Sequence, residues 1–455
     1  MEELYEKTGI EVIGPDSRSY TKAITAWSRK TMYHEDAPER ALSLLSRMNS
    51  SCYAAVKANA FSYTAVVETF SNAGAPVQAE EIFEQMVLRY QESGDEIFKP
   101  TVRSFNAVIN AWAKSSQNNA PQRAESILKR MDELYLSGNA DAKPNRVNFN
   151  CVIDAWGKSG DAKKAEELLQ RMELRYENGD EDMKPNVRSF NTVMDAWAKS
   201  RESDAGKQAE RLMKQMEKLY LAGNVDVKPD VRSYNAVMNA WAKSGDPNAA
   251  QMATNVLERL ERKYEEGDKD LEPDFYSFST VIHAIARSNI IGKEEMAFKI
   301  LLDMKKLYKA GDENAKPNLI IYNAVLNACA YSVGGEENHQ RAMEIAHATF
   351  KELQDFGDDA DEITYGTFIK ACGNLMPHGN VRASVLEALF KKCKAEGKVG
   401  EMVIRQMFTA ASNDMYQRLI GSHVLGQHKF INVEDLPSQW TYNLKRSRRR
   451  EDVNI

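Results

Sequence analysis

Amide and hydroxyl side chains recur along this chain, each placed directly after an aromatic residue. Nine aromatic residues separated by 41 to 44 residues open near-copies of one pattern: Tyr20, Tyr63, Phe105, Phe149, Phe190, Tyr234, Phe278, Tyr322 and Tyr365. The residues that follow them form a first row: Thr21, Thr64, Asn106, Asn150, Asn191, Asn235, Ser279, Asn323 and Gly366. An amide both donates and accepts hydrogen bonds, and so does a hydroxyl. Eight of the nine members could therefore recognise a ligand by hydrogen bonding.

A second polar row stands four residues before each following aromatic residue. Its members are Asn59, Thr101, Asn145, Asn186, Asp230, Asp274, Asn318 and Asp361. Each stands where a helix is expected to begin, and these residue types favour capping of a helix N-terminus. Capping and ligand recognition are compatible roles. Each member pairs with the first-row residue of the preceding repeat, which gives eight pairs.

Two further rows flank these pairs. The row two residues before each aromatic residue is Arg18, Phe61, Arg103, Val147, Arg188, Arg232, Tyr276, Ile320 and Ile363. A guanidinium plane can stack on a ring or reach a phosphate, or an arginine can simply be solvated. Nine residues after the aromatic stand six cations: Arg29, Lys114, Lys158, Lys199, Lys243 and Arg287. These cations could pair with phosphates, and they also suit the negative end of a helix dipole.

One repeat indicates the elements that position these rows. Apolar residues recur at helical spacing within residues 231–241 and again within residues 250–260, which predicts two amphipathic helices. Gly245 is expected to end the first helix, Asp246 to cap the second, and Pro247 to occupy its first position. The repeated unit is therefore a helix A, a tight turn, a longer helix B and a polar loop.

A fixed period of this size predicts an all-α array of about nine stacked helix-turn-helix repeats, because neither helix can bury its apolar face alone. We expect an N-terminal lead-in over residues 1–14, the repeat array over 15–396, a C-terminal helical cap over 397–444 and a basic tail over 445–455. Tryptophans recur seven residues after the aromatic residue, on its own helix face, and are expected to pack between helices: Trp27, Trp112, Trp156, Trp197 and Trp241.

The net charge of −6 is unevenly distributed. The nine windows that run from four residues before each aromatic residue to nine after it carry +5 together, so the remainder of the chain carries −11. Positive helix A segments combined with acidic helix B segments and loops fit nucleic-acid binding better than the net charge alone implies. The first six repeats carry the positive charge and are expected to dominate affinity.

The sequence gives little support for several other functional classes. The five cysteines form no CxxC pair and are expected to be reduced core thiols of an intracellular protein. The seven histidines are not spaced as metal ligands are. We therefore expect no metal, no cofactor and no catalytic activity. No segment is apolar enough to cross a membrane. Neither a secretory signal nor a transit peptide is visible at Met1, which indicates a cytosolic protein or an incomplete N-terminus.

The linked motifs of the repeats resemble the pentatricopeptide repeat family. Residues 229–235 (PDVRSYN) match the opening of helix A in that family, residues 243–245 (KSG) its turn, residues 164–173 (KAEELLQRME) its helix B and Lys228-Pro229 its close. The resemblance covers about residues 15–396, in units that are longer than is usual for the family. The peptide-binding tetratricopeptide family carries a different helix A pattern, which is absent here.

The resemblance implies a right-handed superhelical solenoid that binds single-stranded RNA with one base per repeat. The first and second rows would bind the bases, the third row as far as Ile320 would flank them, and the six cations would bind phosphates. Through the family's pairing rules the eight pairs translate into 5′-A-N-(C/U)-(C/U)-U-U-A-U-3′. Thr21 with Asn59 implies A, for example, and Asn235 with Asp274 implies U.

By the same resemblance the protein would act in RNA processing, stability or translation in a mitochondrion or plastid, and would recruit protein partners to the RNA. Some family members carry an appended catalytic domain, but the zinc motif of a deaminase tail is absent here. The alternative is a helical scaffold that binds protein peptides in the same groove. The basic tail could add phosphate affinity, act as a targeting signal or have no role.

Overall fold

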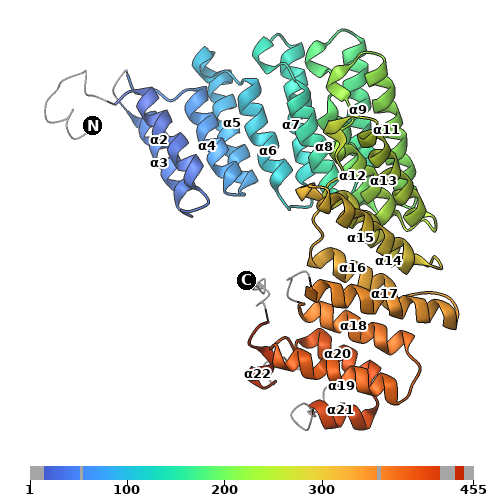
Figure 1. Cartoon of the computed structure of the whole chain (residues 1–455). Coiled ribbons are helices and arrows are strands. Elements are labelled where there is room, and N and C mark those ends of the chain that lie inside the picture. Colours follow the sequence, from blue (N-terminus) through green and yellow to red (C-terminus); the bar gives the residue numbers. More distant parts are fainter. Residues whose placement is uncertain (1–14, 52–54, 356–359, 421–435, 445–455) are drawn as a thin grey trace. The chain divides into compact units, whose positions relative to one another are not determined.

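The computed structural model describes residues 15–51, 55–355, 360–420 and 436–444. The expected lead-in and the basic tail lie outside these residues. All regular elements of the described residues are helices, which confirms the expected all-α class (Figure 1). The chain divides into two units, Met1–Pro229 and Asp230–Ile455, and each is described by itself.

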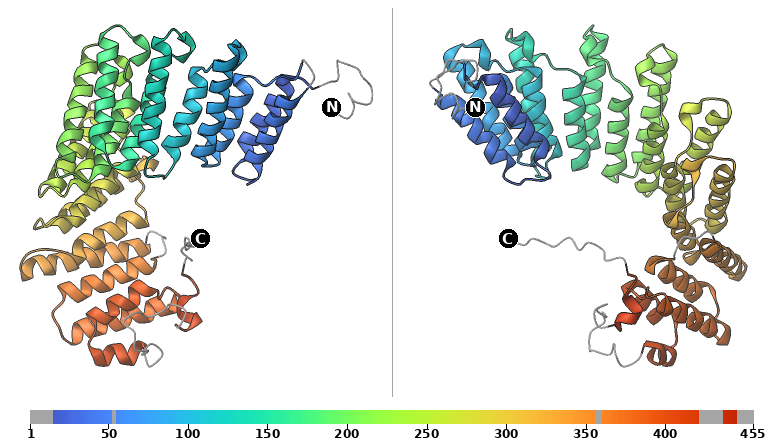
Figure 2. Two further views of the ribbon diagram at one scale, coloured as in Figure 1. Left: turned by 180° about the vertical axis from the view of Figure 1, so that it is seen from behind. Right: turned by 60° about the vertical axis from the view of Figure 1, so that its left-hand side comes forward.

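The described residues of the N-terminal unit form five helix pairs. Its A helices are α2 (Ser17–Lys30), α4 (Ala60–Asn72), α6 (Val102–Lys114), α8 (Arg146–Ser159) and α10 (Val187–Ser200). Its B helices are α3 (Ala37–Ser50), α5 (Pro76–Ser93), α7 (Ala120–Leu136), α9 (Ala162–Glu177) and α11 (Ala205–Leu221). The A helices lie side by side, and each packs against its own B helix and the B helix before it (Figures 1 and 2). Stacking thus buries the face that each pair leaves open.

The C-terminal unit repeats this arrangement. Its A helices are α12 (Val231–Ser244), α14 (Phe275–Arg287), α16 (Leu319–Ala330), α18 (Glu362–Leu375) and α20 (Glu401–Ala410). Its B helices are α13 (Ala249–Glu265), α15 (Lys293–Lys309), α17 (Glu336–Asp355), α19 (Asn380–Ala395) and α21 (Asn413–Ile420), followed by the short α22 (Ser438–Thr441). Because α20 packs on α18 as the other A helices pack on one another, the pairing continues into the segment expected to be a cap.

The turn between the helices of a pair differs slightly from expectation. Gly245 follows α12 with a φ of 72°, a left-handed conformation that glycine adopts without strain. Helix α13 begins only at Ala249. Asp246 accepts a hydrogen bond from the backbone N–H of Asn248 at 2.8 Å, so it orders the turn. Pro247 therefore precedes the helix and does not occupy its first position.

The extra length of these repeats lies after helix B. In the part of the chain that the structure describes, six short 3₁₀ turns follow B helices: Glu96–Phe98, Ala140–Ala142, Glu181–Met183, Val225–Val227, Lys269–Leu271 and Glu313–Ala315. The lysine of the Lys-Pro motif reaches a carboxylate near the next of these turns. The ion pairs are Lys99–Asp141 at 3.1 Å, Lys143–Asp180 at 3.0 Å and Lys184–Asp226 at 2.8 Å. These lysines connect successive loops, which explains part of the Lys-Pro recurrence.

The repeated aromatic residues form the core. Except for Tyr20, which retains slight exposure, the nine are fully buried. Trp112, Trp156, Trp197 and Trp241 are also buried, as expected for packing residues, whereas Trp27 is half-buried. The indole of Trp156 donates a hydrogen bond to Glu125 of α7 at 3.0 Å, and equivalent bonds join Trp112 to Glu80 and Trp197 to Glu166. A carboxylate on helix B thus satisfies the one polar group of the indole in these three tryptophans, whereas the buried indole N–H of Trp241 has no such bond within the described residues.

Small residues allow neighbouring A helices to approach closely. A Cβ atom placed on Gly157 of α8 would lie 2.9 Å from the Cβ of Ala196 in α10.

The cysteines fit the expected core role less uniformly. Cys329, Cys372 and Cys393 are buried, but Cys151 is half-buried, and Cys52 lies outside the described residues. Burial raises the pKa of Cys372 to about 12, so its thiol stays protonated.

Candidate functional site

Residues of the first row contact the N-terminus of the neighbouring A helix. The amide of Asn235 in α12 donates to Asp274 at 3.0 Å, and its oxygen accepts from Ser277 at 2.7 Å. The amide of Asn323 donates to Asp361 at 3.4 Å. Two of the pairs read from the sequence, although nearly 40 residues apart, are therefore in direct contact. The side-chain oxygen of Asn106 accepts a hydrogen bond at 2.7 Å from the amide of Asn148, which stands three residues after its expected partner Asn145.

The second row caps the A helices, as expected. The side chains of seven of its eight members accept hydrogen bonds from backbone N–H groups at a helix start: Asn59, Asn145, Asn186, Asp230, Asp274, Asn318 and Asp361. In the eighth, the backbone N–H of Thr101 donates to the hydroxyl of Ser104 at 2.9 Å. All eight are half-buried. Capping fixes these side chains beside the first row, so they are oriented before any ligand arrives.

Two first-row amides have an unsatisfied acceptor. The Oδ1 atoms of Asn150 and Asn323 are buried, and no hydrogen bond reaches them from the part of the chain that the structure describes. Leaving a buried acceptor unsatisfied costs about 1–3 kcal/mol, so such atoms in a folded protein call for an explanation. A ligand that presents an N–H group would supply the missing bond.

The hydroxyl members of the first row donate locally. Thr21 and Thr64 donate to backbone carbonyl groups one helical turn earlier, at 2.7 and 2.6 Å. Their lone pairs remain as acceptors. The ninth member, Gly366, has no polar side chain, and a Cβ atom added to it would meet Cγ of Met402 from α20 at 2.7 Å. Met402 therefore covers the position that a polar side chain takes in the other repeats.

The third row is exposed and chemically mixed. Phe61 is 65% and Tyr276 69% exposed, which is unusual for large aromatic side chains. Val147, Ile320 and all four arginines of this row are exposed as well. Exposed flat or apolar side chains beside hydrogen-bonding groups suit stacking of an unpaired base.

The six cations nine residues after the aromatic are all exposed. Lys114 and Lys158 line one cleft of about 540 Å³ at the end of α6 and α8. Lys158 is not free of protein contacts, because its ammonium donates to the carbonyl of Ala113 at 2.8 Å and pairs with Asp154 at 2.7 Å. A phosphate at this position would compete with Asp154.

One row of half-buried residues on the helix face of the first row was missed in the sequence. It stands five residues after the aromatic residue, and all nine members are half-buried: Thr25, Glu68, Asn110, Asp154, Asp195, Asn239, His283, Asn327 and Lys370. Glu68 binds Arg103 of the third row through two hydrogen bonds of 3.0 and 3.3 Å. The signal was available, because residues four apart on a helix share a face and this row follows the first row by four.

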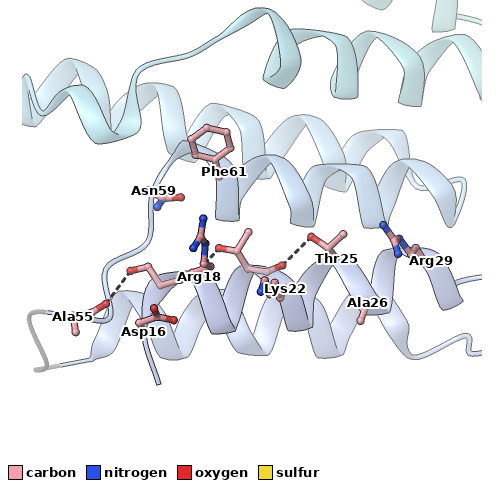
Figure 3. Close-up of a pocket in the computed structure, with 11 residues that line it drawn as sticks. Asp16, Arg18, Lys22, Thr25, Ala26, Arg29, Ala55, Asn59 and Phe61 are labelled. Carbon is pink, nitrogen blue, oxygen red and sulfur yellow. Dashed lines mark hydrogen bonds between the residues drawn. The ribbon is translucent and has the colours of Figure 1, made fainter. Parts of the chain in front are cut away.

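Members of all four rows line one cleft, which we call the first cleft (Figure 3). This cleft of about 840 Å³ lies between α2 and the start of α4, and it is lined by Thr21, Asn59, Arg18, Phe61 and Arg29 among others. The sequence thus identified residues of each row that gather at one site. Asp16 borders the cleft, and hydrogen bonds from Ser19 lower its pKa, so it is ionised at neutral pH.

The described residues offer little for other chemistries. They contain no group of three or more His, Cys, Asp or Glu side chains that could hold a metal ion. None of their helices combines the length and apolar character needed to cross a membrane. What the clefts present is hydrogen-bonding groups, flat side chains and cations.

Comparisons with known proteins agree with the motifs. A family model described as pentatricopeptide repeat domain matches residues 259–332, and one described as PPR repeat matches residues 61–89, 147–176 and 232–255. The crystal structure of the pentatricopeptide repeat protein PPR10 from maize resembles 92% of this chain with a TM-score of 0.50 and 19% sequence identity. The chain spans 55% of that chain's length. A search of curated proteins gives no match.

Proposed function

Because this chain belongs to the pentatricopeptide repeat family, we propose that it binds single-stranded RNA in a sequence-specific manner, with one base per repeat. The observation that carries the proposal is the contact between first-row amides and the caps of neighbouring helices, represented by Asn235 and Asp274 at 3.0 Å. It presents two polar side chains together at the interface of two repeats, where one base edge could contact both.

The unsatisfied oxygens of Asn150 and Asn323 support the same proposal. Uracil and cytosine each carry an N–H donor on the Watson–Crick edge, and these are the bases that the two pairs imply. A bound pyrimidine would therefore satisfy a buried acceptor that the folded protein leaves open. The unsatisfied oxygen would therefore make these two repeats prefer bases that donate a hydrogen bond from the Watson–Crick edge.

Eight repeats would read 5′-A-N-(C/U)-(C/U)-U-U-A-U-3′. Exposed side chains such as Phe61 and Tyr276 would stack beside the bases, and the six cations would contact the phosphates. The ninth repeat would read no base, because Met402 covers Gly366. Members of the family are generally non-catalytic, and we propose that this protein acts by covering its RNA or by recruiting protein partners during processing, stabilisation or translation of mitochondrial or plastid transcripts.

Selection from random RNA, followed by recoding of one repeat, tests the proposal. Changing Asn235→Thr together with Asp274→Asn should shift the sixth base of the selected consensus from U to A and leave the other bases unchanged. The consensus of the unaltered protein serves as the control. A selection that yields no consensus, or a consensus that ignores the change, would overturn the proposal. Binding to peptides with no response to the recoding would favour a scaffold for protein ligands instead.

A further inference from the structure

One face of α2 carries a line of cations that the row-by-row assignment does not explain. Arg18 and Lys22 lie on successive turns of the helix, Arg29 lies two turns further along, and all three line the first cleft (Figure 3). Thr25 completes the line between Lys22 and Arg29. Residues at this spacing share one face of a helix. Lys22 belongs to none of the four rows, so the function proposed above gives it no role.

No carboxylate of the described residues forms an ion pair with this line, although, beside the hydrogen bonds from Ser19, the charge of Arg18 contributes to the lowered pKa of the nearby Asp16. Neither Arg18, Lys22 nor Arg29 forms an ion pair there, and all three side chains are exposed. The nearby carboxylate of Asp16 instead accepts hydrogen bonds from the backbone and hydroxyl of Ser19, at 2.7 and 2.6 Å. The cleft therefore keeps a net positive charge that is open to solvent.

The same face of the other A helices carries fewer free cations. In α6 the equivalent of Arg18 is Arg103, which Glu68 holds at 3.0 Å. In α8 the equivalent of Arg29 is Lys158, which Asp154 holds at 2.7 Å. The position of Lys22 is taken elsewhere by uncharged residues: Ala65, Ala107, Cys151, Thr192, Ala236, Thr280, Ala324 and Thr367. Among the A helices of the described residues, α2 thus carries three cations without an ion-pair partner on one face.

The length of the line excludes a single phosphate as its ligand. Eleven residues separate Arg18 from Arg29, which corresponds to about 16 Å along a helix axis. Ligands of this size with repeated negative charge are extended, as a nucleic-acid backbone is. The base-reading rows cross from helix to helix, whereas this line runs along one helix. The nucleotides that contact the line therefore differ from those whose bases contact the rows.

We propose that Arg18, Lys22 and Arg29 of the first repeat bind successive phosphates of the RNA segment that flanks the recognised bases. Arg18 and Arg29 then act on this segment and not in the roles that their rows take in the other repeats. This inference rests on the RNA-binding function proposed above. The contact requires no base identity, because only phosphates meet the cations. It adds affinity and salt dependence at one end of the site without changing the sequence preference.

An extension experiment tests this proposal with the full chain. Binding is measured over a range of salt concentrations for the eight-nucleotide site, and for the same site extended by three abasic nucleotides at the 5′ end or at the 3′ end. Extension at one end only should tighten binding about tenfold at low salt. It should also steepen the dependence of log affinity on log salt by about 0.7 for each phosphate contacted.

Lys22→Ala should remove most of this gain while leaving the affinity for the unextended site nearly unchanged. Lys30→Ala is the matched control, because Lys30 is an exposed lysine of the same helix that does not line the cleft. Equal gains in the Lys22 and Lys30 variants would overturn the inference, as would a wild-type protein that binds the eight-nucleotide site but gains nothing from either extension. Failure to bind any of the three RNAs would instead overturn the proposed function and the inference together.

Discussion

The guanidinium of Arg103 in α6 is held by the carboxylate of Glu68 in α4, through hydrogen bonds of 3.0 and 3.3 Å. Arg103 was expected to flank a base, yet its charge is already partnered. Glu68→Gln should release it. Because an exposed ion pair contributes about 0.2–1 kcal/mol, we expect RNA affinity to rise about two- to fivefold at low salt. Titrations at several salt concentrations would measure the gain.

The control for this variant is Glu81→Gln, which removes an equal charge from an exposed residue of helix α5. It should leave the salt dependence of RNA binding unchanged. If both variants strengthened binding equally, net charge alone would account for the effect and the Glu68–Arg103 pair would be irrelevant to RNA.

Asn150 offers a test that separates stability from binding. Replacing it with leucine removes a buried acceptor that has no hydrogen bond within the described residues, so the free energy of unfolding should stay unchanged or increase by about 1 kcal/mol. RNA affinity should fall about tenfold, because a bond to the base is lost. Urea denaturation and RNA titration of one preparation would measure both.

Asn235→Leu is the matched comparison for that variant. Both polar atoms of Asn235 are bonded, to Asp274 and Ser277, so the same change removes two hydrogen bonds. It should lower the free energy of unfolding by about 1–3 kcal/mol. A loss of stability in Asn150→Leu as large as that in Asn235→Leu would contradict the assignment of an open acceptor.

The close approach of α8 and α10 predicts a steric effect at Gly157. Valine at this position would force its Cβ to within 2.9 Å of the Cβ of Ala196, unless the helices move apart. Overpacking of this kind lowers the free energy of unfolding by about 1–3 kcal/mol. Gly335→Val is the control, since a Cβ there meets no atom within 4 Å and its φ is not left-handed. Denaturation in urea should show a loss for Gly157→Val alone.

Glu261 in α13 predicts a pH dependence of stability. Burial raises its pKa to about 7, with further contributions from the charges of Asp303, Glu258 and Glu265 and a small opposing effect of Lys299. An acid whose pKa is higher in the folded state favours folding while protonated. Its cost to stability is therefore absent below 4.5, the ordinary pKa of a glutamate in the unfolded chain, grows as the pH rises to about 7 and stays constant above that.

Glu261→Gln should consequently raise the free energy of unfolding at pH 8 by about 1–2 kcal/mol, after allowance for the partial exposure of the side chain. The gain should disappear at pH 4. Thermal or urea unfolding at both pH values, with the wild type in parallel, would measure it. A gain of equal size at pH 4 and pH 8 would show that ionisation of Glu261 is not its cause.

The sequence by itself determined the repeat, its helix pairs and the rows of polar residues. These follow from spacing along the chain, because a helix of fixed periodicity converts residue number into a helix face. The aromatic core, the buried tryptophans and the capping role of Asn59 or Asp361 could all be predicted in this way. The identity of the residue at each position then limited the kind of ligand.

Only the tertiary structure decided which of these residues touch. Glu68 and Arg103 are 35 positions apart, and nothing in their spacing showed that one neutralises the other. The same holds for the bond between Asn106 and Asn148, where Asn145 was expected, and for Met402 covering Gly366. Such contacts join neighbouring helices, and the rotation and separation of those helices depend on how all their side chains pack together.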